Sequence, residues 1–132
     1  MTLIYIDTNI YLDFLISGRP KRFAEEAFQI FNRALRCEFE IIISKKVKNE
    51  LRPNIEGKES ALLFQLLEPK LRPVDPSKQD EEDARNLEPV DTADALHAIL
   101  ARKHKAKFLV TQNIKHFQKF SKLIQPVRPS EL

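Results

Sequence analysis

Short apolar runs alternate with longer segments of helical periodicity along this chain. Each run is continuously apolar instead of alternating with polar residues, which is typical of strands that are covered on both faces of a sheet. The strongest runs are residues 3–6, 39–43 and 108–110, and weaker candidates are residues 71–74 and 123–127. The pattern therefore predicts a set of short, mostly buried strands.

The segments between these runs carry apolar side chains at helical spacing. Residues 22–35 show the clearest pattern, with an apolar arc wider than one contact face needs. Ser44 suits the N-cap of the next helix, which Pro53 ends, and Asp91 suits the N-cap of a later one. The predicted helices are residues 22–35, 44–51, 59–68 and 91–104. Strands that alternate with helices predict one α/β domain over residues 1–132, built around a mainly parallel sheet.

Composition excludes several classes of protein. Hydrophobic residues make up 42% and charged residues 31%, which is ordinary for a folded domain and too apolar for a disordered chain. A lone cysteine, Cys37, rules out an internal disulfide, and we expect it to be a small buried side chain. Two glycines, Gly18 and Gly57, cannot build a glycine-rich phosphate loop. Because the first residues lack a basic leader and two aspartates interrupt their apolar run, we expect a cytoplasmic protein without a membrane span.

Charge is unevenly distributed, although the net charge is only +3. Acidic residues dominate from residue 75 to 94, and the run at 80–83 suits the solvated first turn of a further helix. From residue 95 onward lysine and arginine outnumber acids, which is compatible with a polyanionic partner. A solvated surface that binds nothing accounts for this charge equally well. If the partner is RNA, the candidate phosphate contacts are Lys103, Lys105, Lys115 and Lys119.

Polar residues gather where the predicted strands end. In open parallel sheets, ligands bind at the carboxyl ends of the strands. Asp7 follows the first strand, Glu50 lies on the short helix after the second, and Thr111 follows the third of the strong runs. Asp94 lies in the first turn of the helix that precedes that last run. We therefore expect side chains from four segments to converge at one edge of the sheet.

Four motifs occupy these positions. They are, in chain order, IYIDTNIYLDF, IIISKKVKNEL, ADALHAILA and LVTQNIKHF, and together they extend to about Phe117. In order and spacing they resemble the PIN-domain family, which has an aspartate after its first strand, a glutamate on a short helix, an aspartate on an Ala-rich helix and a strand that ends in Thr or Ser. The resemblance implies a three-layer α/β/α fold with a four- or five-stranded sheet, and metal-dependent ribonuclease activity.

A cluster of carboxylates also has a chemical requirement of its own. Like charges held within a few ångström disfavour joint ionisation, so such a cluster needs a cation. Mg²⁺ and Mn²⁺ prefer oxygen ligands, and when bound by carboxylates they polarise a phosphodiester and activate water for in-line attack. On this interpretation Asp7 and Asp94 ligate the metal directly, whereas Glu50 acts through a water or orients the attacking water. Asn9 and Thr111 then hold the carboxylates in place.

The fourth motif departs from the PIN pattern at Asn113, where the family usually has an aspartate. An amide oxygen still ligates a hard cation or hydrogen-bonds its water, but it brings no charge. We therefore expect a lower metal affinity, which disfavours a second metal ion, and we do not infer a loss of activity.

Each candidate residue also has a purely structural interpretation. Asp7 at a strand end suits a cap of the following helix, and Glu50 suits a solvated helix position. Asp91 and Asp94 resemble a capping box, in which Asp91 caps the helix while Asp94 still turns toward the metal. We expect His97 on a second face of its helix and not among the ligands, because the histidines form no metal pattern.

A free-standing PIN-like chain of this size most resembles the toxin of a type II toxin–antitoxin pair, the VapC kind. Such a toxin implies endoribonuclease activity and a small antitoxin whose helix occupies the active-site groove. RNA is favoured over DNA on family grounds alone. The wide apolar arc at residues 22–35 also suits burial by a partner helix or by a second copy in a homodimer.

Other functions stay open. A housekeeping RNA-processing nuclease would work without an antitoxin. A catalytically silent PIN-like module that binds RNA or protein would account for Asn113 as a sign of decay. A phosphoacceptor domain also carries acids at strand ends, but it needs paired acids after the first strand, where this chain has Asp7 alone.

Overall fold

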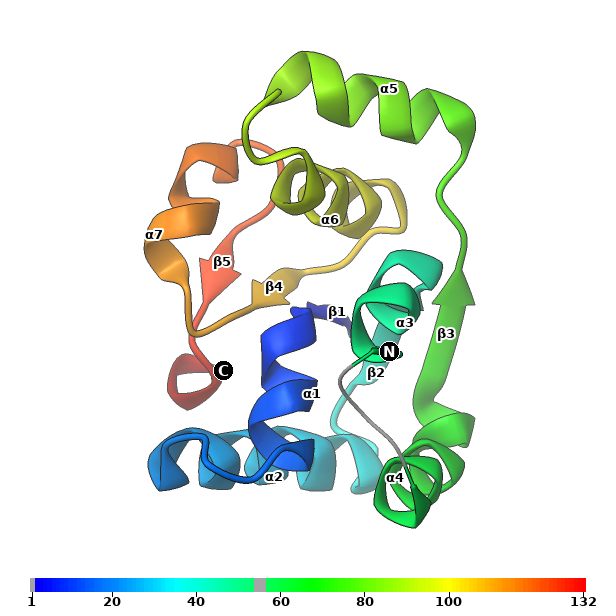
Figure 1. Ribbon diagram of the computed structural model, residues 1–132, viewed down its shortest axis with the longest axis vertical. Helices are drawn as coiled ribbons and strands as arrows, with labels where there is room; N and C mark the ends of the chain where they lie inside the picture. The colour runs from blue at the N-terminus through cyan, green and yellow to red at the C-terminus, as the bar shows by residue number, and fades with distance from the viewer. Residues whose placement is uncertain (1, 54–56) are drawn as a thin grey trace.

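Five parallel strands form the centre of the computed structural model, which describes residues 2–53 and 57–132 (Figure 1). Their order is β3-β2-β1-β4-β5, so β1 is the central strand. Within this sheet Tyr5 of β1 lies opposite Ile42 of β2 and Leu109 of β4. The strands are β1 (Leu3–Ile6), β2 (Glu40–Ser44), β3 (Leu71–Val74), β4 (Phe108–Val110) and β5 (Pro126–Val127). The predicted parallel sheet is confirmed, and each predicted run contributes a strand to it.

Helices cover both faces of the sheet. One face carries α1 (Thr8–Leu15), α2 (Lys21–Leu35) and α4 (Lys58–Leu67), while the other carries α5 (Lys78–Leu87), α6 (Thr92–Lys103) and α7 (Ile114–Phe117) (Figure 1). The short helix α3 (Lys45–Leu51) follows β2 directly and contacts α1. Single 3-10 turns occupy Glu68–Lys70, Gln118–Phe120 and Pro129–Glu131. The three-layer α/β/α architecture that the PIN resemblance implies is therefore confirmed.

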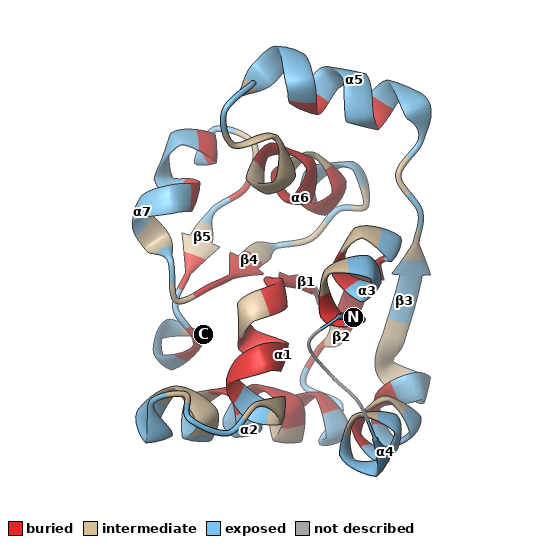
Figure 2. Ribbon diagram, in the orientation of Figure 1, coloured by how far each residue is buried: buried red, intermediate tan, exposed pale blue. Residues whose placement is uncertain are grey.

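The three inner strands form the core, as their uniform apolar sequences predict. Their buried side chains are Ile4, Tyr5, Ile6, Ile41, Ile42, Ile43, Leu109 and Val110. Figure 2 shows these strands buried between two layers of helices whose outer surfaces are exposed. The edge strand β3 differs, because Arg72 and Pro73 are exposed there. A proline is tolerated at this position since an edge strand has one side without a partner.

Helix α1 shows no amphipathic period in the sequence, and the periodicity analysis did not identify it. Its residues Thr8, Ile10, Tyr11, Leu12 and Asp13 are all buried. A helix that is enclosed on most sides needs apolar residues all round, so it shows no contrast between two faces. This burial matters for the site, because α1 begins directly after Asp7 and holds that residue rigidly.

Helix α2 buries one side of its wide apolar arc, namely Ala27, Ile30, Phe31 and Ala34. The other side stays accessible, with Phe28 50% exposed and Leu35 42% exposed. The ring of Phe14, at the end of α1, stacks on Phe28 with ring centroids 6.4 Å apart. The arc is thus wider than its contact with α1 requires, as the sequence indicates.

Cys37 does not fit the expectation of a buried side chain, which was wrong. It is exposed in the turn after α2, at a φ of 66°. Lys70 Nζ donates a hydrogen bond to its sulfur at 3.0 Å. The chain reverses here between a surface helix and β2, and this reversal carries the thiol to the outside.

Membrane insertion finds no support in the helices of residues 2–53 and 57–132. None of them is long and apolar enough to cross a bilayer.

Candidate active site

The carboxyl ends of β1, β2 and β4 meet beside the first turns of α1, α3 and α6 (Figure 1). The backbone N–H of Asp7 donates to the carbonyl of Val110 at 2.9 Å, which extends the ladder between β1 and β4 by one residue. The N–H of Thr111 donates likewise to Val127 at 2.9 Å. Asp7 and Thr111 therefore leave neighbouring strands side by side, in the same direction.

Asp7 is a buried carboxylate at this edge, with only 5% of its surface exposed. Thr111 Oγ1 donates to Asp7 Oδ2 at 2.9 Å, and the backbone N–H of Asn113 donates to Thr111 Oγ1 at 2.9 Å. Burial raises the pKa of Asp7, His97 and Thr111 oppose that rise, and the charge of Asp94 adds to it. The ionised Asp7 side chain is therefore costly in this site, and a bound cation would relieve that cost.

Glu50 faces inward from α3. Its Oε1 accepts a hydrogen bond from Thr8 Oγ1 at 2.6 Å and lies 2.8 Å from His97 Nε2. Lys46 Nζ lies 3.5 Å from the other oxygen, Oε2. Burial alone would raise the pKa of Glu50, but the bonds with His97 and Thr8 and the charge of Lys46 outweigh burial and lower it to about 2. Glu50 is thus an ionised carboxylate oriented from three helices.

His97 is the residue that the sequence analysis undervalued. It is 2% exposed and lies between Tyr5 and Glu50, with Nδ1 2.6 Å from the Tyr5 hydroxyl. The signal was present in the sequence, because His97 follows Asp94 by three positions and residues three apart share a face of a helix. The side chains of Thr8, Ser44 and Lys46 also belong to this site, and the sequence did not predict them there.

Asp94 lies half-buried in the first turn of α6, and His116 Nδ1 is 3.5 Å from its Oδ2. Asp91 occupies the N-cap position of α6, but its side chain contacts Lys119 and, in the described chain, makes no capping hydrogen bond. Asp7 occupies the N-cap position of α1, and a hydrogen bond between its carboxyl group and the backbone of Asn9 opposes the rise of its pKa. The structural interpretation as a helix cap therefore fails for the Asp91 side chain and keeps support for Asp7.

The two asparagines of the motifs differ in their contacts. Asn9 lies half-buried in the first turn of α1, one residue beyond Thr8. Asn113 is exposed at the N-cap position of α7, where its backbone N–H supports Thr111. Asn113 thus acts on Asp7 through Thr111, and this contact uses its main chain instead of its amide side chain.

The donor groups are of the chemical type that a hard divalent cation prefers. Asp7 and Asp94 offer carboxylate oxygens and interact electrostatically, and oxygen is the ligand that Mg²⁺ and Mn²⁺ prefer. Within residues 2–53 and 57–132, however, no three His, Cys, Asp or Glu side chains are gathered closely enough to form a ready-made metal site. Glu50 is turned toward Thr8 and His97. The structure therefore brings Asp7 and Asp94 into electrostatic interaction without assembling a metal site, and direct ligation by the two aspartates with Glu50 acting through water stays a prediction.

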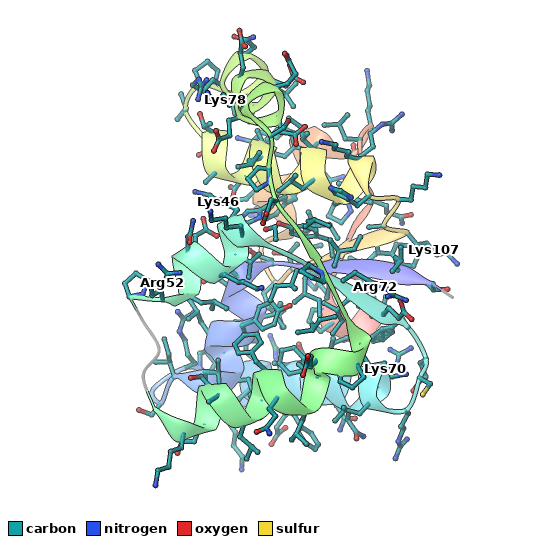
Figure 3. The ribbon with its side chains drawn as sticks, turned by 90° about the vertical axis from the view of Figure 1, so that its right-hand side faces the viewer. Lys46, Arg52, Lys70, Arg72, Lys78 and Lys107 are labelled. Atoms are coloured by element: carbon teal, nitrogen blue, oxygen red, sulfur yellow. The ribbon has the colours of Figure 1, made fainter. Side chains whose placement is uncertain are left out.

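The structure does not bring the four candidate lysines together. Lys103 Nζ is held by Asp80 at 2.9 Å, and Lys119 is paired with Asp91 and with Glu88. Lys105 lies in the turn between α6 and β4, at the amino edge of the sheet. Lys107, two residues beyond Lys105, marks that edge in Figure 3 and lies on the side opposite Lys46 of α3. Lys115, in the first turn of α7, lies at the carboxyl edge beside His116.

Other cations line two cavities beside residues of the site. A cavity of about 380 Å³ is lined in part by Lys45 and Lys46, the second of which contacts Glu50. A second cavity, of about 360 Å³, is lined in part by Arg22, Arg128 and Gln112, the residue directly after Thr111. These cations follow from the meeting of separate elements, so charge counting along the chain could not select them.

Comparison with known proteins agrees with this fold. No curated protein sequence matches the chain significantly. Among solved structures, a chain of VapBC2 from Rickettsia felis, bound to a DNA fragment from its promoter, superposes with a TM-score of 0.65 at 19% identity, covering 96% of this chain and 98% of that one. FitAcB from Neisseria gonorrhoeae gives a TM-score of 0.64 at 17% identity, with coverages of 98% and 99%. The sequence profile of the PIN domain matches residues 4–123. The chain therefore belongs to the PIN domain family.

Proposed function

We propose that this protein is a Mg²⁺- or Mn²⁺-dependent endoribonuclease, the toxin of a type II toxin–antitoxin pair. One observation carries the nuclease proposal. A buried Asp7, whose pKa is raised by burial and by the charge of Asp94, ends the central strand of a PIN domain. A carboxylate that is costly to ionise without a cation is what a metal-dependent site requires.

A bound divalent cation would polarise the phosphodiester and lower the pKa of a water molecule. Asp7 and Asp94 would hold that cation, and Thr111 would keep the Asp7 carboxylate in one orientation through its hydroxyl. Glu50 would orient the attacking water with a carboxylate that Thr8 and His97 hold in place through Oε1. With a pKa of about 2, Glu50 is a poor proton acceptor at neutral pH, so its role is orientation and charge stabilisation.

We propose that RNA crosses the carboxyl edge of the sheet. Of the lysines selected from sequence, Lys115 is the candidate contact beside the acids, whereas Lys105 would reach only RNA that extends around to the opposite edge. Lys103 and Lys119 would first have to leave their carboxylate partners. The polar cavities lined in part by Lys46 and by Arg128 supply further candidate phosphate contacts.

Besides the antitoxin helix expected in the active-site groove, we propose that the antitoxin also covers an accessible apolar surface over α2 and α4. Phe28 and Leu35 of α2 are exposed, and Leu62 and Leu66 of α4 are 56% and 53% exposed. α2 and α4 contact each other, so these side chains can form one surface. An amphipathic helix of a small partner would bury it by the usual helix-in-groove mode. The likeness of the fold to a chain of VapBC2 supports this choice over a second copy of the chain.

The central experiment is cleavage of RNA by the purified protein. A fluorescently labelled single-stranded RNA should be cut with Mn²⁺ or Mg²⁺ and left intact with EDTA. Asp94→Asn should lose most of this activity, whereas the matched control Asp83→Asn, on the exposed side of α5, should keep it. Cleavage in EDTA would reject the metal proposal. An inert wild type that binds no Mn²⁺ would favour a silent binding module.

A further inference from the structure

Tyr5 is a buried polar side chain that the proposed mechanism leaves without a role. It lies in the middle of the central strand and is 0% exposed. Its hydroxyl lies 2.8 Å from Ser44 Oγ and 2.6 Å from His97 Nδ1. A tyrosine hydroxyl can donate one hydrogen bond and accept another, so both contacts can be hydrogen bonds. A phenol inside an apolar sheet is expensive unless its hydrogen bonds are satisfied, and both of these bonds lead toward the candidate site.

The donors and acceptors in this network can be assigned in sequence. A carboxylate can only accept, so His97 Nε2 carries the proton that it shares with Glu50 Oε1 at 2.8 Å. In a neutral imidazole Nδ1 is then an acceptor, and the Tyr5 hydroxyl must donate to it. Ser44 in turn donates to the Tyr5 oxygen, while Ser44 Oγ accepts from the backbone N–H of Val47.

The opposite assignment leaves one proton without an acceptor. If Tyr5 donated to Ser44, the hydroxyl proton of Ser44 would need an acceptor of its own, and the described contacts of Ser44 are Tyr5 and the Val47 N–H. A buried donor without an acceptor carries a desolvation penalty. The bonds therefore run in one direction, from Ser44 through Tyr5 and His97 to Glu50.

We propose that Tyr5 is a positioning residue, which fixes His97 as its Nε2–H tautomer and thereby fixes the orientation of the Glu50 carboxylate. Glu50 Oε1 receives Thr8 from α1 and His97 from α6, so its carboxylate is held from two elements. The other oxygen, Oε2, lies 3.5 Å from Lys46 Nζ. The consequence for catalysis rests on the proposed nuclease function, whereas the tautomer itself does not.

The first test is the tautomer of His97, measured by nitrogen-15 NMR of histidine-labelled protein. Wild type should show a protonated Nε2 and an unprotonated, hydrogen-bonded Nδ1. Tyr5→Phe removes only the hydroxyl, and the Nδ1 signal should then shift away from its hydrogen-bonded position. Tyr11→Phe is a matched control. Tyr11 is equally buried, and its hydroxyl has no hydrogen-bond partner among the described residues.

The second test measures function in the same variants. Tyr5→Phe should lower Mn²⁺ affinity, or kcat for RNA cleavage, by about 10-fold with little change in KM, as is usual when a partner behind a metal-site residue is removed. Tyr11→Phe should change neither. His97→Gln keeps an amide donor near the position of Nε2, and in that background Tyr5→Phe should cause little further loss, because coupled residues are not additive.

The outcomes separate this inference from the proposed function. A wild-type His97 protonated on Nδ1 would overturn the inference. An Asp7-dependent nuclease with unchanged Mn²⁺ affinity and kcat in Tyr5→Phe would also overturn it while leaving the proposed function intact. If the protein cleaves no RNA but Tyr5→Phe alters the His97 signals and weakens Mn²⁺ binding, the positioning role stands and the nuclease proposal fails. Thermal melts of each variant would show that the fold persists.

Discussion

Thr111 and Asp7 are separated by 104 positions, yet the hydroxyl of one donates to the carboxylate of the other at 2.9 Å. The two residues directly follow the neighbouring strands β4 and β1, and the backbone N–H of each is hydrogen-bonded to an adjacent strand. This carboxylate is buried, held by a neutral hydroxyl and placed beside a second acid. Its negative charge is therefore poorly compensated without a cation. This relationship leads to a stability prediction as well as a catalytic one.

Replacing Asp7 by Asn should stabilise the metal-free protein while removing its activity. The folded-state pKa of Asp7 is raised above the ordinary value of 3.8, so this group contributes stability below that pH and loses it as pH rises through the folded pKa. Asp7→Asn removes the stability cost of ionising this buried carboxyl group, so the Tm of the variant at pH 7 should exceed that of wild type by a few degrees. The difference should shrink below pH 4. Differential scanning calorimetry in EDTA measures both, and a lower Tm at pH 7 would contradict the electrostatic account.

Glu50 should show the opposite pH dependence. Its pKa is lowered from 4.5 to about 2, so the carboxylate contributes stability above pH 4.5 and loses it as pH falls toward 2. Glu50→Gln should therefore have a lower Tm than wild type at pH 7, and the two curves should converge between pH 4.5 and 2. Glu59→Gln, at an exposed position of α4, serves as the control and should follow wild type throughout. A Glu50→Gln deficit that is independent of pH would point to lost packing instead of lost charge.

Affinity for RNA should depend on Lys115 more than on Lys103. Lys115 lies at the carboxyl edge, whereas Lys103 is held by Asp80 near the opposite edge. Each phosphate neutralised on a single strand contributes about 0.7 to the slope of log K against log salt. Lys115→Gln should flatten that slope by about this amount, and Lys103→Gln should leave it unchanged. Fluorescence anisotropy titrations at several salt concentrations, with an inactive Asp94→Asn background, would decide between the two. Equal effects of both variants would place the RNA on another surface.

Asn113→Asp should strengthen the response to metal. The substitution keeps the size of the side chain and adds a carboxylate at the N-cap of α7, where the backbone N–H that supports Thr111 is unaffected. The added charge raises repulsion with Asp7 and Asp94 in EDTA, and a cation relieves it. The Tm in EDTA should fall slightly, and the rise caused by saturating Mn²⁺ should exceed that of wild type, because the ligand binds the native state. An identical rise in both proteins would show that position 113 does not face the metal.

Local patterns were sufficient for most of the fold. Continuous apolar runs such as residues 41–43 have both faces covered in the structure, so period and burial agree. The pattern of α2 was visible because one side packs against α1 and the other meets solvent. α1 escaped the same reasoning because its surroundings bury nearly every face, and Cys37 was misassigned because a surface turn has no periodicity.

By itself, the sequence determined the order of the elements. It also determined where each acid lies relative to the end of a strand or the start of a helix. These properties depend on neighbours within a few positions, namely strand period, helix period and the polar residue that follows a strand. Only the tertiary structure decided which oxygen faces which donor. Glu50 meets Thr8 and His97, which are 42 and 47 positions away, and Lys103 is captured by Asp80 instead of remaining available to a phosphate. Such contacts are set by how α1, α3, α5 and α6 pack over the sheet, and packing of elements distant along the chain leaves no mark in local spacing.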